Sequence, residues 1–319
     1  MIRFLVTGGH RYELECVCKA PQAPRVSLMG YDRLLRANWL RRATYVFADI
    51  DRLGFWDLEI AAHAYLEMKR LGLSVWNNPA KVKTRYALLR ALPRAGLNDF
   101  NIYRADEINP SIRFPVFLRK NQLHDGPLTD LLHCVRELEN AIATAVNSGT
   151  PMENLVVIEF AAEPVQPGIY RKLSAYRIGD VIVSAMSFHK AGWLVKIGQL
   201  GLAGEDLYRD ELKLLQTNPF AEHLKKALEI AGIEYGRADF GIYKGRVQIY
   251  EINTNPFIGG LFPHPSAIRQ ESMRLCWDKY LEALRVLDSG GGWPVRLPNG
   301  TLQRRRVRAN LFVRTRKTA

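Results

Sequence analysis

Two features that mark exported or membrane proteins are missing from this sequence. No apolar run approaches the roughly 18 residues that a membrane span needs. The apolar stretch at residues 1–6 is also too short for the central region of a signal peptide. These absences predict a cytoplasmic protein that makes no membrane contact.

Cysteine is scarce as well. Cys16 and Cys18 lie close together, but Cys134 and Cys276 are far away and do not form the second pair that a zinc site would need. The four cysteines are therefore interpreted as buried free thiols. The chain has 319 residues, 47% of them hydrophobic, which is enough for two or three lobes and a sizeable core.

The chain has fewer acidic than basic residues. It contains 45 Lys and Arg and 32 Asp and Glu, so its net charge is +13. Eight of these positive charges lie in residues 289–319, which hold no acidic residue, so the other 288 residues carry only +5. Such a body is modestly basic. The basic tail remains open as a site for nucleic acid, for an acidic partner, or for neither.

The most informative feature is a set of polar residues inside two apolar strands. Residues 235–243 and 246–253 read as a hairpin around Lys244 and Gly245. Two carboxylates, an amide and a guanidinium interrupt these strands: Arg237, Asp239, Glu251 and Asn253. Carboxylate and amide oxygens suit Mg²⁺ beside substrate phosphates, and an arginine suits a phosphoryl group.

The register of this hairpin decides whether the four side chains can act together. A two-residue turn would pair Asp239 with Tyr250 and send Glu251 to the opposite face. A three-residue loop with Gly245 as a left-handed bulge would pair Asp239 with Ile249 and Arg237 with Glu251. Because only the second register puts all four on one face, the sequence predicts the bulged loop.

Residues 236–239 (Gly-Arg-Ala-Asp) and 251–256 (Glu-Ile-Asn-Thr-Asn-Pro) resemble the metal-binding hairpin of ATP-grasp enzymes. That family includes D-alanine–D-alanine ligase, glutathione synthetase and ligases that add glutamate to a ribosomal protein. The resemblance implies that Asp239, Glu251 and Asn253 hold two Mg²⁺ on the phosphates of ATP, with Mn²⁺ as a possible substitute. It also implies that Arg237 steadies the transferred phosphoryl group and the tetrahedral intermediate.

The resemblance extends to residues that contact the phosphates. Arg85, on a helix expected over residues 84–95, occupies a place where a lysine is more usual; a plain surface arginine is the alternative. Arg119 and Lys120 end a strand expected over residues 114–120, and Arg119 is favoured because alternation points the two to opposite faces.

A glycine loop follows that strand. In the family such a loop closes over the phosphates, so Asp125 and Gly126 are expected to contribute to ATP binding, and a helix is expected over residues 129–146. His124 is explained equally well as an ordinary loop residue and as a functional residue. The Gly8-Gly9 pair near the N-terminus lacks a full phosphate-binding fingerprint and reads as a turn.

The strand over residues 155–160 resembles the family's adenine-binding hinge. The resemblance implies that the backbone around Glu159 and Ala161 binds the adenine edge, that Phe160 lines the ring, and that Glu163 accepts hydrogen bonds from the ribose. Glu159 needs a partner because it ends an apolar strand. For Glu163 an exposed loop position is an equal alternative.

Lys172 lies on a hairpin expected to turn at Gly179-Asp180, and it is the favoured residue to face the nucleotide. The following segment carries His189, Trp193 and Lys196, which either contact the acceptor substrate or cover the sheet. Further helices are expected over residues 205–216, 220–231 and 266–287.

These elements predict an α+β chain with the ATP-grasp fold and a small N-terminal α/β lobe. The expected parts are the N-terminal lobe (1–80), the small ATP-grasp lobe (81–154), the large lobe with the metal hairpin (155–288) and the basic tail (289–319). In the N-terminal lobe, strands are expected over residues 2–6 and 44–48 and a helix over residues 56–71.

The resemblance implies an ATP-dependent carboxylate–amine ligase. A small-molecule or peptide carboxylate would be converted to an acyl phosphate, which an amine then captures; this chemistry relies on positioning and charge neutralisation. Two alternatives stay open. One is a phosphotransferase acting on a small acceptor, and the other is a nucleotide-sensing protein that binds nucleic acid through its basic tail.

Overall fold

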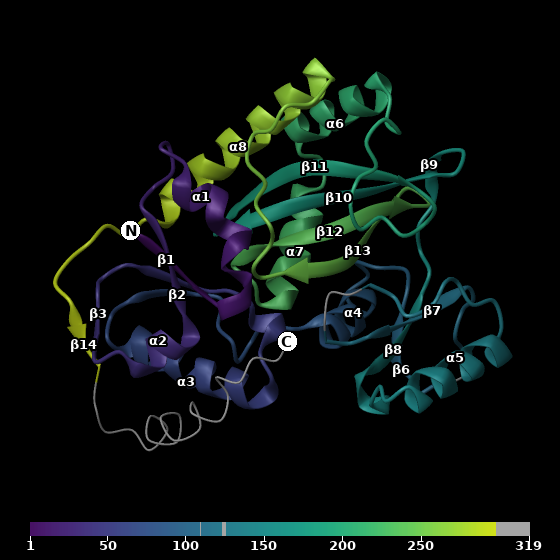
Figure 1. Ribbon diagram of the computed structural model, residues 1–319, viewed down its shortest axis with the longest axis horizontal. Coiled ribbons are helices and arrows are strands. Elements are labelled where there is room, and N and C mark those ends of the chain that lie inside the picture. The colour runs from purple at the N-terminus through teal and green to yellow at the C-terminus, as the bar shows by residue number, and fades with distance from the viewer. Residues whose placement is uncertain (109, 123–125, 298–319) are drawn as a thin grey trace.

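A computed structural model describes residues 1–108, 110–122 and 126–297 of the chain (Figure 1). The N-terminal lobe is a parallel sheet in the order β2-β1-β4-β5, made of β1 (Ile2–Val6), β2 (Val26–Gly30), β4 (Thr44–Phe47) and β5 (Ser74–Trp76). Its central strands are buried on both faces, as parallel strands require. The predicted strands at residues 2–6 and 44–48 are confirmed.

Short helices accompany this sheet: α1 (Glu15–Lys19), α2 (Tyr31–Arg36) and α3 (Phe55–Arg70), with 3-10 turns at Gly8–Leu14 and Ile50–Arg52. The third agrees with the helix expected over residues 56–71. Strand β3 (Trp39–Leu40) pairs with β14 (Val295–Arg296), so the end of the described chain returns to the N-terminal lobe.

The small lobe is an antiparallel sheet in the order β6-β8-β7, built from β6 (Ile102–Arg104), β7 (Val116–Lys120) and β8 (Leu155–Glu159). Helices α4 (Arg85–Arg94) and α5 (Val135–Asn147) accompany it. Helix α5 begins later than expected, because Pro127 and Leu132 instead form bridges to β7. The predicted lobe boundary falls before β8, yet β8 pairs with both strands of the small sheet, which therefore extends to Glu159.

The large lobe is an antiparallel sheet in the order β11-β10-β12-β13, with β9 (Pro164–Gln166) added beside β10. Its strands are β10 (Ile169–Ile178), β11 (Val181–Ala191), β12 (Tyr235–Tyr243) and β13 (Arg246–Asn253). Helices α6 (Glu205–Thr217), α7 (Ala221–Ala231) and α8 (Ala267–Leu287) pack on this sheet (Figure 1). The expected α+β architecture with a small N-terminal α/β lobe is thus observed, and the sheet of that lobe is parallel.

The predicted register of the β12–β13 hairpin is wrong, although its consequence holds. Lys244 and Gly245 both have positive φ, at 51° and 74°, and form a two-residue turn that pairs Phe240 with Ile249. A bulge then falls at Tyr250, so Asp239 pairs with Glu251 and Arg237 with Asn253. The extra residue in β13 restores the shared face that the bulged loop was expected to supply.

Asn77 joins the N-terminal sheet to the large lobe. It is fully buried with a positive φ of 60°, and its amide nitrogen donates to the carbonyls of Phe47 and Tyr235. Its amide oxygen accepts from the backbone N–H groups of Glu234 and Tyr235. A buried side chain with all these partners fixes β4 against the start of β12.

The structure also bears on the predictions about cysteines and membrane spans. Cys276 is buried, whereas Cys16, Cys18 and Cys134 are exposed, so the expectation of buried thiols is wrong for three of the four. Within the described ranges, none of the helices combines the length and apolar character needed to cross a bilayer.

Candidate functional site

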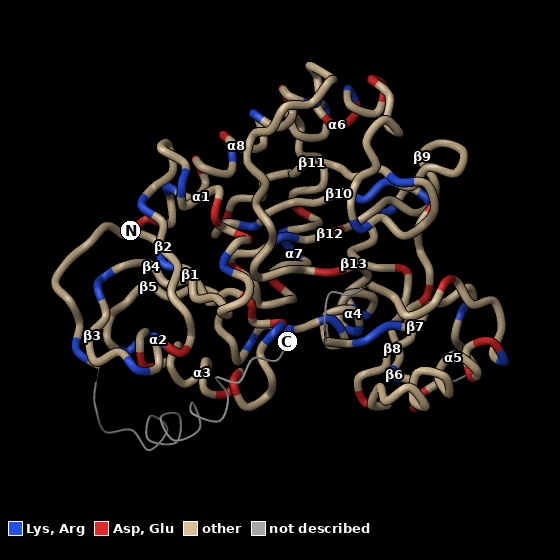
Figure 2. The backbone as a smooth tube through the Cα atoms, viewed as in Figure 1, with Lys and Arg blue, Asp and Glu red and all other residues tan. Residues whose placement is uncertain are grey.

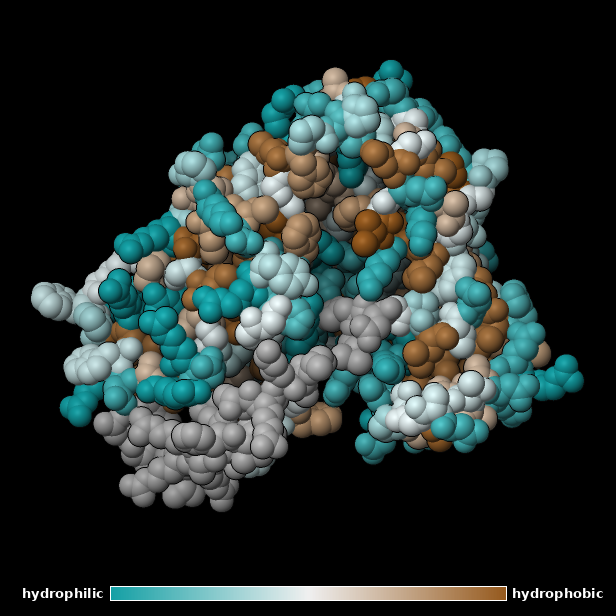
Figure 3. All heavy atoms as spheres, in the orientation of Figure 1, coloured by the Kyte–Doolittle hydropathy of each residue, from teal (hydrophilic) through white to brown (hydrophobic). Residues whose placement is uncertain are grey.

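A cavity of about 660 Å³ opens between the small lobe, the large lobe and the loops of the N-terminal lobe. Strands β7 and β8 form one wall, and strands β10, β11, β12 and β13 form the opposite one. Lys and Arg positions, in blue, and Asp and Glu positions, in red, occur on the central strands (Figure 2). The space-filling view shows hydrophilic side chains in the middle of this face, with hydrophobic ones beside them (Figure 3). All four residues of the predicted metal hairpin line this cavity.

The two carboxylates of the hairpin face each other across β12 and β13, because Asp239 and Glu251 are register partners. Asp239 is almost completely buried and accepts from Lys172 at 3.0 Å and from Arg237 Nε at 2.8 Å. Burial by itself would lower the pKa of Arg237, but Asp239 and Tyr176 outweigh it and raise the pKa. Arg237 is therefore a permanent cation.

Glu251 forms an ion pair with Arg85, a residue that accompanies the small lobe. Arg85, at the start of α4, donates to Glu251 Oε2 at 3.1 Å and to the carbonyls of Lys120 and Asn121 at 3.2 and 2.6 Å. This buried arginine therefore links the metal hairpin to the end of β7. Its contacts place it behind the cavity wall, against one of the predicted metal ligands.

Arg119 is a predicted phosphate residue with a buried donor that is unpartnered among the described residues. It lines the cavity, and its buried Nε makes no hydrogen bond to a described residue. Burial lowers the pKa of Arg119 to about 10, and Arg85 adds to this effect while Glu251 opposes it. Lys120, the next residue, does not line the cavity, as strand alternation predicts.

The far end of the cavity is aromatic. The Phe160 and Trp193 rings lie 5.8 Å apart at 87°, and Phe117 lies 5.1 Å from Trp193. Tyr250, the bulged residue of β13, donates its hydroxyl to the carbonyl of Ala161 at 3.0 Å. A flat aromatic ligand edge would meet apolar rings and backbone polar groups here.

Glu159 has the partners that its burial requires. Its carboxylate accepts from Arg113 at 2.6 Å, from the backbone N–H groups of Asn101 and Arg113, and from the Tyr103 hydroxyl. Burial pushes its pKa up, but these donors outweigh burial and the pKa is lowered. The side chain thus anchors the hinge strand to the small lobe.

Some of the other predicted ATP-binding residues line the cavity and some do not. Lys172, Ala161 and Gly126 line the cavity together with Phe160. Glu163 does not line it; its exposed carboxylate accepts from the backbone N–H of Lys244 at 3.1 Å. Asp125 lies outside the described residues.

Several lining residues were left open or missed by sequence reasoning. Trp193 and Lys196 line the cavity, whereas His189 is buried away from it. Arg269, on α8, also lines the cavity and is held by Glu211 and by the carbonyl of Ser187. Helix α8 carries charged residues at many positions, so the sequence offers no signal that singles out Arg269 or indicates which side of α8 faces the cavity.

The N-terminal lobe contributes Tyr12, Glu13 and Arg52 to the opposite end of the cavity. Arg52 lies 3.6 Å from Glu13 and 3.5 Å from Asp49. This lobe therefore reaches the cavity through the segments that follow β1 and β4.

The donor set fits a magnesium ion bound together with phosphate groups. Across the described ranges, no cluster of three His, Cys, Asp or Glu residues could hold a metal by itself. Two carboxylates and one amide are instead what Mg²⁺ needs when substrate phosphates and water complete its shell. Arg119 lines the same cavity, and its Nε, partnerless among the described residues, fits an anion beside that ion.

Comparison with known proteins supports the architecture. No known protein family and no curated protein sequence matches the chain. The VanG D-Ala:D-Ser ligase of Enterococcus faecalis has 11% identity and a TM-score of 0.50, covering 90% of this chain and 98% of its own.

Two further solved structures cover the same shares of both chains. A D-alanine–D-alanine ligase from Bacillus anthracis complexed with ATP has 11% identity and a TM-score of 0.48. A RimK domain ATP-grasp protein from Sphaerobacter thermophilus has 14% identity and a TM-score of 0.48. At such identities the likeness concerns the fold, and the fold of this chain is that of the ATP-grasp ligases.

Proposed function

We propose that this chain of ATP-grasp fold is an ATP-dependent ligase that joins a carboxylate to an amine. One observation carries the proposal: Asp239 and Glu251 oppose each other on strands that also bring Arg237 and Asn253 into the same cavity. The four residue types, in this arrangement, suit a metal-bound triphosphate.

In this proposal Asp239, Glu251 and Asn253 hold two Mg²⁺ ions, which neutralise phosphate charge when they are bound. Arg119 and Lys172 contact the phosphates from opposite walls of the cavity. Arg85 acts on Glu251 and fixes its carboxylate. Asp125 and Gly126, which follow β7 in the sequence, complete the phosphate side, whereas Lys120 points away from the cavity and is not assigned to it.

The charge balance supports a polyanionic ligand. Seven lysine and arginine side chains line the cavity, including Arg119, Lys172 and Arg237, against four carboxylates. An excess of positive charge in a partly enclosed cavity is costly unless an anion offsets it. A nucleotide with its metal ions would supply that anion.

The aromatic end is assigned to adenine. Phe160 and Trp193 provide apolar ring faces, and backbone groups between Glu159 and Ala161 face the adenine edge. Glu159 holds this segment through its bonds to the small lobe. Glu163 is assigned to the ribose; it would have to give up its bond to Lys244.

The reaction needs no side-chain nucleophile. A substrate carboxylate oxygen attacks the γ-phosphorus of ATP, ADP leaves, and an amine then attacks the acyl carbon and releases phosphate. Arg237 is positioned to stabilise negative charge on the acyl oxygen, because Asp239 keeps it charged and oriented. The carboxylate substrate is a small molecule or a peptide.

The test is a screen of amino acids, peptides and sugar acids for substrate-dependent ADP release, followed by mass spectrometry of the product. A new amide with equimolar ADP and free phosphate supports the ligase. Phosphate retained on the acceptor would indicate a phosphotransferase instead. Full activity of Glu251→Gln would remove the metal assignment.

A further inference from the structure

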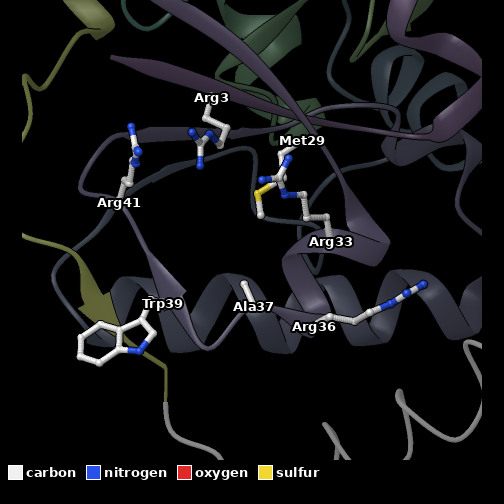
Figure 4. Close-up of a pocket in the computed structure, with 7 residues that line it drawn as sticks. All are labelled: Arg3, Met29, Arg33, Arg36, Ala37, Trp39 and Arg41. Carbon is white, nitrogen blue, oxygen red and sulfur yellow. The ribbon is translucent and has the colours of Figure 1, made fainter.

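We propose that a second pocket, on the N-terminal lobe, binds a single strand of nucleic acid. This arginine pocket has a volume of about 590 Å³ and shares no lining residue with the ATP cavity. It is lined by Arg3, Met29, Arg33, Arg36, Ala37, Trp39 and Arg41 (Figure 4). These residues come from β1, β2, α2, β3 and the residues directly after α2 and β3.

The charge of the pocket is largely uncompensated. Arg36 lies 3.6 Å from Asp32, its only ion-pair partner among described residues. Arg3 is steadied by Ser27 at 3.1 Å and by the Tyr45 ring, neither of which carries a negative charge. In the described ranges, Arg33 and Arg41 pair with no carboxylate, so three guanidinium groups are available to an anion.

The basic residues of the pocket are all arginines, and this favours phosphate. A guanidinium binds phosphate through two parallel hydrogen bonds, which a lysine cannot do. Figure 4 shows Arg3, Arg33 and Arg41 on one side of the lobe, above Trp39 in that view. Several guanidinium groups around one hollow suit consecutive phosphates of a strand.

Two tryptophans supply the surfaces on which bases stack. Trp39 is 60% exposed and lies on β3, opposite Arg296 of β14. Trp293 is 89% exposed and lies two residues before β14. Each base of a single strand offers a flat face that can stack on such a ring.

An acidic protein segment is the rival ligand, and chemistry separates the two. Carboxylates would satisfy the arginines but would leave Trp39 and Trp293 without a stacking partner. Nucleic acid uses both the charge and the rings, so the combination favours a single strand.

The test measures fluorescence anisotropy of a labelled 12-nucleotide single strand titrated with the full chain. We expect Arg33→Glu/Arg41→Glu to weaken binding at least tenfold and to flatten the salt dependence, because each lost phosphate contact removes about 0.7 from the slope for single strands. Trp39→Ala should weaken binding by about tenfold. The matched control is Arg94→Glu/Arg136→Glu on the small lobe, which reverses the same charge at exposed sites and should bind as the wild type.

Three outcomes would overturn the proposal. Arg33→Glu/Arg41→Glu with wild-type affinity would show that the arginine pocket does not bind the strand. Polyglutamate with equal affinity and equal sensitivity to Trp39→Ala would point to an acidic protein. A loss of binding shared equally by the small-lobe control would indicate only net charge. Thermal melting of each variant verifies its fold, and the ligase proposal stands or falls separately on ADP release.

Discussion

Lys172 Nζ lies 3.0 Å from Asp239 Oδ2, so a lysine from β10 contacts the carboxylate that we assign to a metal ion. The same carboxylate accepts from Arg237. An ion at this position would compete with the lysine, because both need the same lone pairs in a mostly buried place. Lys172 is therefore expected to favour phosphate when nucleotide is present and to oppose the metal when it is absent.

We expect Lys172→Gln to raise the affinity for a metal ion alone and to lower the affinity for Mg-ATP. Affinity for Mn²⁺ alone, followed by electron paramagnetic resonance, should rise about three- to tenfold because the competing charge is gone. Affinity for Mg-ATP, followed by calorimetry, should fall. Lys225→Gln removes a lysine that lies 3.6 Å from the exposed Asp180 and should change neither. Lower Mn²⁺ affinity in Lys172→Gln would contradict the competition.

Asp239→Asn should impair both activity and stability. It leaves Lys172 and Arg237 facing a neutral amide in a buried setting, and breaking a buried ion pair typically costs about 3–5 kcal/mol of unfolding free energy. Urea denaturation measures that loss. Asp180→Asn is the control, because Asp180 is exposed and surface pairs contribute about 0–1 kcal/mol. A variant as stable as the wild type would mean that the pair contributes little.

Arg119 and Arg237 should respond differently to the same substitution. Burial lowers the pKa of Arg119 to about 10, so the folded protein disfavours its charge, and Arg119→Met should change the unfolding free energy by less than about 1 kcal/mol. The pKa of Arg237 is raised, so Arg237→Met should cost about 1–3 kcal/mol. Arg119→Met should nevertheless weaken ATP binding about tenfold or more. Equal destabilisation by the two variants would contradict the contrast.

The sequence predicts the shared face of the metal hairpin but not the way in which the chain produces it. Asp239 and Glu251 reach one face in either of two ways, by a bulge at the turn or by a bulge within β13. Residue types do not separate these options, because Lys244 is not a residue expected at positive φ. The bulged residue Tyr250 bonds through its hydroxyl to the carbonyl of Ala161, a contact that only the folded protein has.

Elements and residues without a local sequence pattern could not be predicted. Strands with apolar cores, such as β1 and β8, can be read from their sequence, whereas β5 and β6 have three residues each and are formed by their neighbours. Trp193 lies on a loop, where its orientation is set by packing on Phe117 and Phe160 from the other lobe. Such contacts between distant segments leave no periodic signal.

Glu159→Gln should destabilise the protein in a pH-dependent way. The folded-state pKa of Glu159 lies below its ordinary value of 4.5, so its stabilising effect is complete above that value and is lost as the pH falls through the folded pKa. At pH 7 the variant should lose about 2 kcal/mol, the value of a hydrogen-bonded buried charge. Near pH 3 the two proteins should approach each other.

The control for this pH series is Glu139→Gln on α5, an exposed position where the substitution should have little effect at any pH. Urea denaturation at pH 7, 5 and 3 measures the difference. A gap between Glu159→Gln and the wild type that stays constant with pH would mean that the carboxylate acts through shape and not through charge.

Trp193 offers a direct optical readout of the adenine assignment. The chain has six tryptophans, all of them among the described residues, and Trp193 is the one that lines the ATP cavity. Binding of Mg-ADP should therefore quench emission in the wild type, and Trp193→Phe should lose this signal while keeping most of its affinity, because a phenyl ring still stacks. Trp193→Ala should bind ADP about five- to tenfold more weakly by calorimetry. Trp293→Phe, which changes an exposed tryptophan far from the cavity, should keep the full signal. If Trp193→Phe kept it as well, the base would have to bind away from Phe160, and the adenine end of the cavity would need to be reassigned.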